Sequence, residues 1–135
     1  MRFIDTNVLL YAVSKDQREQ VKAARANELL QYRDLALSVQ VLQEFYVQAT
    51  RSNRPDPLTH EQAVGLVETF LRFPVQEIDV PIALAALAAR ERFQISYWDA
   101  AIIEAARALG CEVVLSEDLS DRQDYSGVTV LDPFN

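Results

Sequence analysis

Short apolar segments alternate with helix-forming segments along the chain, and this alternation limits the possible folds more than any other feature. Five strand-like segments are predicted, at residues 2–5, 34–38, 75–79, 113–116 and 128–131. Helical segments separate the first four, so the connections are crossovers and the strands run parallel. The sequence therefore predicts an α/β fold with three layers and a mainly parallel sheet of four to five strands.

Capping residues and apolar stripes mark the predicted helices, which span about 7–11, 18–32, 39–50, 59–72, 81–93 and 96–109. Thr59 with Gln62, and Ser96 with Asp99, have the spacing of capping boxes. The helix at 39–50 has an apolar stripe of Leu42, Phe45, Tyr46 and Ala49. On the helix at 59–72, we expect Val64, Val67 and Leu71 to share one side.

The length of 135 residues predicts one domain, residues 1–135. Its longest unbroken run of hydrophobic residues, Ile82 to Ala89, is far shorter than the ~20 residues of a membrane-spanning helix. No secretory signal follows the N-terminus, so we expect a cytoplasmic protein without a membrane partner. A single cysteine, Cys111, and a single histidine, His60, exclude a disulfide framework and a Cys/His zinc site.

The charge is acidic, with 20 acids against 13 bases and a formal net charge of −7. Sequence-independent binding of nucleic acid through a basic surface is therefore disfavoured, because it needs clustered cations. The isolated glycines also exclude a glycine-rich phosphate loop. A hypothesis of a nucleic-acid function therefore has to explain the excess of acidic residues.

Several acids follow predicted strands, where ligands of parallel sheets bind. Asp5 follows the first strand, Asp99 begins a helix, and Glu117, Asp118 and Asp121 follow the fourth strand, while Glu44 lies in the helix after the second. Four carboxylates at ~5 Å would repel one another by ~3 kcal/mol per pair, ~20 kcal/mol in total. That exceeds the ~5–15 kcal/mol stability of a domain, so converging acids need protons or cations. Oxygen ligands alone favour Mg²⁺ or Mn²⁺.

Spacing alone leaves simpler interpretations open. Asp5 and Asp99 could act only as helix caps. Glu44 lies nearly opposite the apolar stripe of its helix and could be solvated. The acids from Glu117 onwards could form an ordinary exposed turn.

Four motifs together resemble the PIN domain, particularly the VapC-type toxins of bacterial toxin–antitoxin pairs. They are Phe3-Ile4-Asp5-Thr6-Asn7-Val8-Leu9, Leu42-Gln43-Glu44-Phe45, Tyr97-Trp98-Asp99-Ala100-Ala101 and Val114-Leu115-Ser116-Glu117-Asp118-Leu119. Each motif is unspecific alone, whereas four in this order at single-domain length are much stronger. The resemblance extends to the closing Asp132-Pro133-Phe134.

The resemblance implies a metal-dependent endoribonuclease that hydrolyses RNA phosphodiester bonds by means of Mg²⁺ or Mn²⁺. The acids that match the family's catalytic quartet are Asp5, Glu44, Asp99 and Asp118. Of these, Asp5, Asp99 and Asp118 are expected to bind the metal, and Glu44 to orient water, act as general base or bind a second ion.

The resemblance also implies supporting residues around the quartet. The predicted polar supports are Thr6, Asn7 and Ser116. From their place in the loop after the helix of Glu44, Arg51 and Arg54 are the predicted phosphate contacts, with solvated loop arginines as the simpler interpretation. Asp121 and Glu117 are alternatives to Asp118 or additional acids, and Asp118 ranks first because Ser116-x-Asp118 matches the family pattern.

The partners implied by the resemblance are an RNA substrate, a small cognate antitoxin and a second copy of the chain in a homodimer. The alternative is a non-catalytic binding module with the same fold, whose acids bind a cation or a basic peptide. RNA cleavage distinguishes the two hypotheses.

Overall fold

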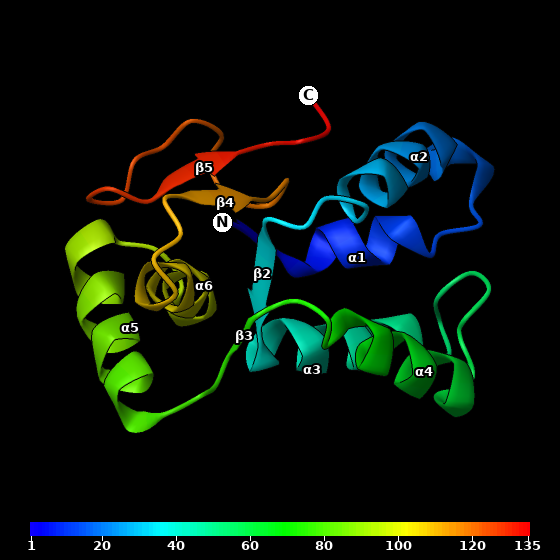
Figure 1. The fold of residues 1–135 in the computed structure, drawn as a ribbon, viewed down its shortest axis with the longest axis horizontal. Helices are drawn as coiled ribbons and strands as arrows, with labels where there is room; N and C mark the ends of the chain where they lie inside the picture. Colours follow the sequence, from blue (N-terminus) through cyan, green and yellow to red (C-terminus); the bar gives the residue numbers. More distant parts are fainter.

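The computed structural model describes all residues, 1–135, and strands alternate with helices as the sequence predicts (Figure 1). The strands are β1 (Arg2–Ile4), β2 (Leu35–Ser38), β3 (Val75–Gln76), β4 (Val113–Leu115) and β5 (Thr129–Leu131). The helices are α1 (Thr6–Ala12), α2 (Gln20–Leu29), α3 (Val39–Ala49), α4 (His60–Phe70), α5 (Val80–Phe93) and α6 (Tyr97–Ala108). A short 3-10 helix, Gln17–Glu19, precedes α2.

All five strands run parallel in the order β3-β2-β1-β4-β5. The chain begins at the central strand, builds outward through β2 and β3, and then crosses back to place β4 on the other side of β1. In that register Arg2 is paired with Leu35 of β2 and with Val113 of β4. The reversal of strand order between β1 and β4 is where ligands of open parallel sheets bind.

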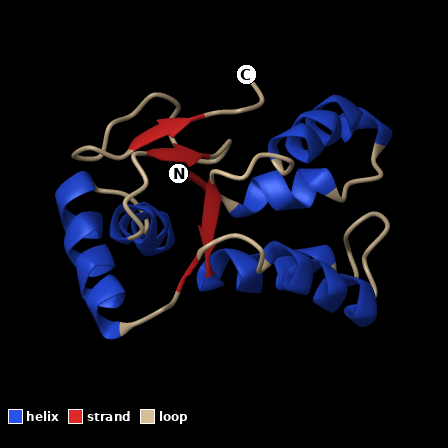
Figure 2. Ribbon diagram, viewed as in Figure 1, coloured by secondary structure: helices blue, strands red, loops and turns tan.

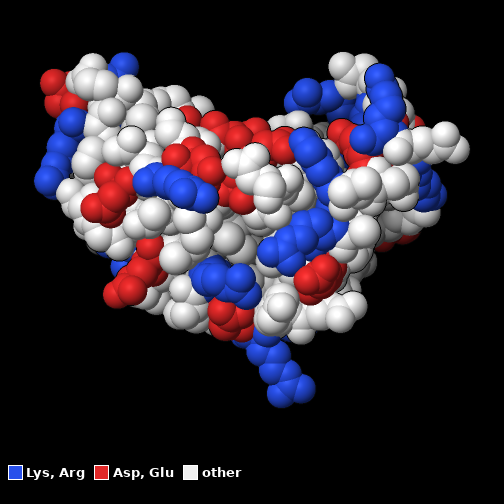
Figure 3. Space-filling view, turned by 90° about the horizontal axis from the view of Figure 1, so that it is seen from above, with Lys and Arg blue, Asp and Glu red and all other residues white.

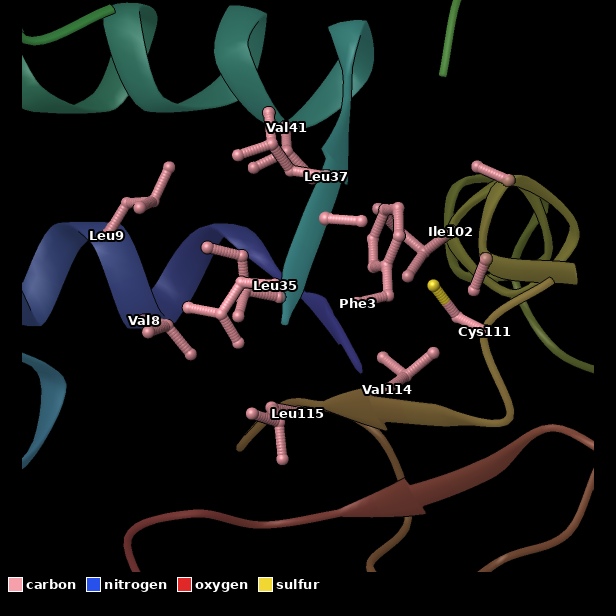
Figure 4. Close-up of a cluster of buried hydrophobic side chains, with 14 of the residues drawn as sticks. Phe3, Val8, Leu9, Leu35, Leu37, Val41, Ile102, Cys111, Val114 and Leu115 are labelled. Atoms are coloured by element: carbon pink, nitrogen blue, oxygen red, sulfur yellow. The ribbon is translucent and has the colours of Figure 1, made fainter. Parts of the chain in front are cut away.

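Helices cover both sides of the sheet, which confirms the predicted three-layer α/β class (Figure 2). Helix α6 packs against β2, β3 and β4, and α5 covers α6, while α1 to α4 lie on the other side (Figure 1). Buried side chains from both sides meet around the strands, including Phe3, Leu37, Val114 and Ile102 (Figure 4). Cys111 is buried in this core. None of the helices is long and apolar enough to cross a membrane.

Helix α3 follows its predicted pattern closely. The Ser38 hydroxyl accepts a hydrogen bond from the Val41 N–H at 3.3 Å and caps the helix. Leu42, Phe45 and Ala49 are buried, and Phe45 meets Phe70 of α4 edge-on with ring centroids 5.3 Å apart. This contact fixes α4 against α3 and leaves the opposite side of α3 for other contacts.

Two local predictions need correction, and one is refined. On α4, Val64 and Val67 are half-buried and line a cavity between α3 and α4, whereas Leu71 caps the C-terminus and is 56% exposed; the fully buried residues are Ala63 and Phe70. Strand β3 is only two residues long, since it lies at the sheet edge and pairs with β2 alone. The helix predicted from residue 18 begins as a 3-10 turn because Asp16 caps that turn.

Candidate active site

A cavity of about 300 Å³ is lined by segments that follow β1, β2 and β4 and by the start of α6. Its lining contains six acids and one base. The acids are Asp5, Glu19, Glu44, Asp99, Glu117 and Asp118, and the base is Arg54. Acidic side chains also form a band across a notch in the molecular surface, with basic side chains on the raised part beside it (Figure 3). We call the cavity the acidic pocket.

Asp5 directly follows β1, at the point where the strand order reverses between β1 and β4. Its backbone N–H donates to the Leu115 carbonyl at 3.0 Å, which continues the β1–β4 pairing. Its carboxylate accepts from the Thr6 N–H at 2.7 Å, so Asp5 caps α1, and from the Ser116 hydroxyl at 2.7 Å. With 6% of its surface exposed, Asp5 is both a helix cap and a buried acid of the pocket.

Asn7 joins the start of α1 to the loop after β4. Its side-chain amide donates to the Ser116 hydroxyl at 3.2 Å and to the Asp118 carboxylate at 3.1 Å, and its side-chain oxygen accepts from the Glu117 N–H at 3.3 Å. Ser116 is fully buried and also accepts from the Asp118 N–H at 3.1 Å. These bonds hold the loop that carries Asp118 beside Asp5.

Glu44 faces the acidic pocket rather than bulk water. Its carboxylate accepts from the Thr6 hydroxyl at 3.2 Å and from the Gln40 amide at 3.3 Å. The side of α3 opposite its apolar stripe therefore lies against the start of α1, which covers Glu44. Helix periodicity alone cannot reveal this contact between distant segments.

Asp99 enters the pocket from the first turn of α6. The Ser96 hydroxyl accepts from the Asp99 N–H at 3.0 Å and caps the helix. The reciprocal bond of the predicted capping box, from the Ser96 N–H to the Asp99 carboxylate, is not formed. The carboxylate instead lines the pocket with Asp5, Glu44 and Asp118.

Burial and mutual repulsion raise the pKa of three of these acids. Burial raises the pKa of Asp5 to about 6 despite its two hydrogen bonds, and the charges of Asp118 and Glu44 add to the increase. Burial, then the charges of Asp99 and Asp118, also raises the pKa of Glu44. Burial and the charge of Asp118 raise the pKa of Asp99. No basic side chain forms an ion pair with any of the three.

The donors suit a hard divalent cation in kind, because carboxylate oxygens are what Mg²⁺ and Mn²⁺ prefer. The raised pKa values also favour a cation site, because a bound cation would offset the repulsion between the carboxylates. As the side chains stand, however, no three of them form a group that could hold a metal ion. Coordination by Asp5, Asp99 and Asp118 therefore stays a prediction.

The remaining predicted residues lie at different places. Glu117 lines the pocket, but Lys22 and Tyr11 both donate hydrogen bonds to its carboxylate. Asp121 is not part of the lining and accepts bonds from the Asp132 N–H and the Asn135 side chain. Arg54 lines the pocket and donates to the Leu10 carbonyl at 3.3 Å, while Arg51 lines a neighbouring cavity.

Some lining residues were not predicted, notably Gln40, Gln48 and Trp98. The first two lie one helical turn before and after Glu44, and Trp98 directly precedes Asp99. Helical spacing from Glu44 would have been the signal for the two glutamines, whereas Trp98 has no such spacing and is marked only by its place in the motif beside Asp99. His60 is exposed, and its ring nitrogen lies 2.8 Å from the Tyr46 hydroxyl.

The pattern that defines the PIN domain matches residues 2–122, so the chain belongs to the PIN domain family. Among solved structures, a toxin–antitoxin complex from Klebsiella pneumoniae is similar, with 20% identity over 98% of both chains and a TM-score of 0.68. VapC20 from Mycobacterium tuberculosis, a sarcin–ricin loop cleaving toxin, has 20% identity over 87% of this chain and 92% of its own, with a TM-score of 0.68.

A DNA-bound VapBC from Salmonella typhimurium has 22% identity over 98% of this chain and 97% of its own, again with a TM-score of 0.68. At such identities the likeness shows the fold, which is that of VapC toxins. A comparison with curated protein sequences found no significant match. The resemblance inferred from the four motifs is thus confirmed at the level of family and fold.

Proposed function

We propose that residues 1–135 form one nuclease domain, a metal-dependent endoribonuclease that acts as the toxin of a toxin–antitoxin pair. The observation that carries this proposal is the acidic pocket. Four carboxylates from four separate segments line it at the topological switch point, and no basic residue forms an ion pair with Asp5, Glu44 or Asp99. A domain tolerates such repulsion most readily where the acids bind a cation.

Each residue has a distinct part in this proposal. Asp5, Asp99 and Asp118 would hold Mg²⁺ or Mn²⁺, which when bound supplies a Lewis acid that lowers the pKa of water and offsets charge on the phosphate. Glu44 orients the attacking water or accepts its proton, because its carboxylate is already positioned by Thr6 and Gln40. Asn7 and Ser116 keep the carboxylates in place, and Arg54 contacts the RNA backbone at the pocket edge.

The proposed partners follow from the solved relatives, several of which are toxin–antitoxin complexes. A small antitoxin with a basic segment would complement the acidic pocket and block RNA. The exposed apolar side chains of α5, Val80, Leu84 and Leu87, lie at i, i+4 and i+7 and favour a homodimer through this helix.

The alternative is a non-catalytic module that binds a cation or a basic peptide. One observation favours its peptide form, because the carboxylates do not form a ready coordination group for a metal ion. Cleavage of RNA decides between the two functions.

The test is incubation of the purified protein with labelled cellular RNA in Mg²⁺, in Mn²⁺ and in EDTA. We expect cleavage with either metal and none in EDTA, and a loss of roughly 100-fold or more in Asp99→Asn, which keeps the shape but removes a ligand charge. Asp124→Asn is the matched control, because Asp124 is exposed and its carboxylate only accepts from the Gly127 N–H. Equal rates in the wild type and Asp99→Asn would favour the binding module.

A further inference from the structure

A second cavity, of about 290 Å³, adjoins the acidic pocket and has a different character. The two cavities share Gln40, Glu44, Gln48 and Trp98, so they form one continuous groove along α3. The second cavity adds Gln43, Val47 and Arg51 to its walls. Its only charged residues are Glu44 and Arg51, so its lining carries no net charge and includes one cation that a phosphate group could contact.

Trp98 forms the wall common to both cavities. It is the only tryptophan of the chain, and 65% of its surface is exposed although the side chain is large and aromatic. Tyr97 meets it edge-on with ring centroids 5.0 Å apart, which restrains the indole without covering it. An exposed tryptophan next to an acidic pocket is suited to stack on a planar ring.

Glutamine side chains of α3 provide hydrogen-bonding groups in the cavity that Trp98 also lines. The Gln40 amide nitrogen lies between two acceptors, the Glu44 carboxylate at 3.3 Å and the Trp98 carbonyl at 3.2 Å. This arrangement fixes the orientation of the amide, and its oxygen accepts no hydrogen bond from the protein. Gln40 is only 8% exposed, so this acceptor is held in a defined position at the groove. Gln43 and Gln48 add further donors and acceptors.

We propose that this part of the groove binds one unpaired nucleotide of an RNA strand, next to the phosphodiester in the acidic pocket. The base stacks on Trp98, the glutamine amides bond to its edge, and its phosphate contacts Arg51. Stacking on the indole requires a base that is free of its own helix, which a duplex does not offer. The inference rests on the proposed function for the identity of the strand, but it concerns binding rather than cleavage.

The unique tryptophan makes the test direct. In EDTA, a short single-stranded oligoribonucleotide should quench the Trp98 fluorescence in a saturable way, whereas inorganic phosphate should not. Arg51→Ala should weaken the binding several-fold, and Arg90→Ala, which removes an exposed arginine of α5, should leave it unchanged. A blunt duplex of the same sequence should quench less.

Fluorescence anisotropy of labelled RNA extends the test to variants without tryptophan. Trp98→Ala should lose most of the affinity and Trp98→Phe should restore part of it, because phenylalanine keeps an aromatic face. Cleavage with unchanged Trp98 fluorescence would overturn the subsite and leave the nuclease proposal intact. Quenching without cleavage in Mg²⁺ would support the subsite and overturn the nuclease. If Trp98→Ala instead halves the molar mass in solution and RNA does not quench, the groove is a contact between two copies of the chain.

Discussion

The acids of this protein behave in opposite ways in two regions of the molecule. In the acidic pocket, Asp5, Glu44 and Asp99 have no basic partner, and burial together with neighbouring negative charges raises the pKa of each. On the surface, Asp34 forms two bonds with the Arg2 guanidinium, at 2.8 and 2.9 Å, and these lower its pKa. Ionised acids therefore lower the stability of the fold in the acidic pocket, whereas the ionised Asp34 raises it at the surface.

Glu117 marks the boundary between the two regions. It lines the pocket, yet Lys22 and Tyr11 donate to its carboxylate. Burial on its own raises the pKa of Glu117, but the two hydrogen bonds outweigh this effect and the net direction is downward. Position at the pocket alone therefore does not define a candidate ligand.

The largest expected effect on stability comes from the charge of Asp5. Since its folded pKa is about 6 instead of 3.8, its contribution to stability is complete below pH 3.8 and is lost as the pH rises through 6. The difference corresponds to about 3 kcal/mol at neutral pH. In metal-free urea unfolding, Asp5→Asn should therefore gain up to about 3 kcal/mol relative to the wild type between pH 4 and pH 7.

Asp34→Asn is the control for this prediction, and its stability relative to the wild type should depend on pH in the opposite direction. The pKa of Asp34 is lowered, so its contribution is present at neutral pH and is lost as the pH falls through the folded pKa. Relative to the wild type, Asp34→Asn should therefore change little between pH 4 and pH 7 and gain stability only as the pH falls below 3.8, the ordinary value of an aspartate. A gain of Asp34→Asn equal to that of Asp5→Asn between pH 4 and pH 7 would mean that the two regions do not differ as described.

The sequence predicts the secondary structure well because most helix starts have a local signal. Ser38, Thr59, Asp79 and Ser96 all cap helices through their side chains. The parallel sheet follows from the crossovers, and the carboxyl ends of the strands then indicate where acids gather. Glu44 could not be placed from its own helix, because the contact that covers it comes from Thr6, far away in the sequence.

The same limitation explains the other differences at the site. Nothing local distinguishes Glu117 from Asp118, since only the folded chain brings Lys22 to the former and Asn7 to the latter. Asp121 lies only three residues beyond Asp118 but bonds to the C-terminal segment. Ion pairs between distant segments thus decide which acids stay unpaired, and spacing does not encode them.

Binding of a divalent cation is the next largest expected effect. A ligand of the folded state at 100 times its Kd adds about 2.7 kcal/mol of stability, so Mg²⁺ should raise the Tm of the wild type by several degrees. In Asp99→Asn the increase should be much smaller, because one of the proposed ligands loses its charge. NaCl at equal ionic strength is the control, since simple screening also reduces repulsion. Equal increases with both salts would mean that the pocket has no specific cation site.

The smallest expected effect is the loss of the Lys22–Glu117 ion pair. Both side chains are partly exposed, at 41% and 25%, so water and salt screen the pair. Its coupling energy in a double-mutant cycle of Lys22→Met and Glu117→Gln should therefore be below about 1 kcal/mol.

Lys22→Met should nevertheless strengthen Mg²⁺ binding, measured by calorimetry, because Glu117 then becomes a further unpaired carboxylate at the pocket. Adding Glu117→Gln should cancel that gain. An unchanged Mg²⁺ affinity in Lys22→Met would show that the charge of Glu117 has no influence on the pocket, and that the boundary between the two regions lies closer to Asp118.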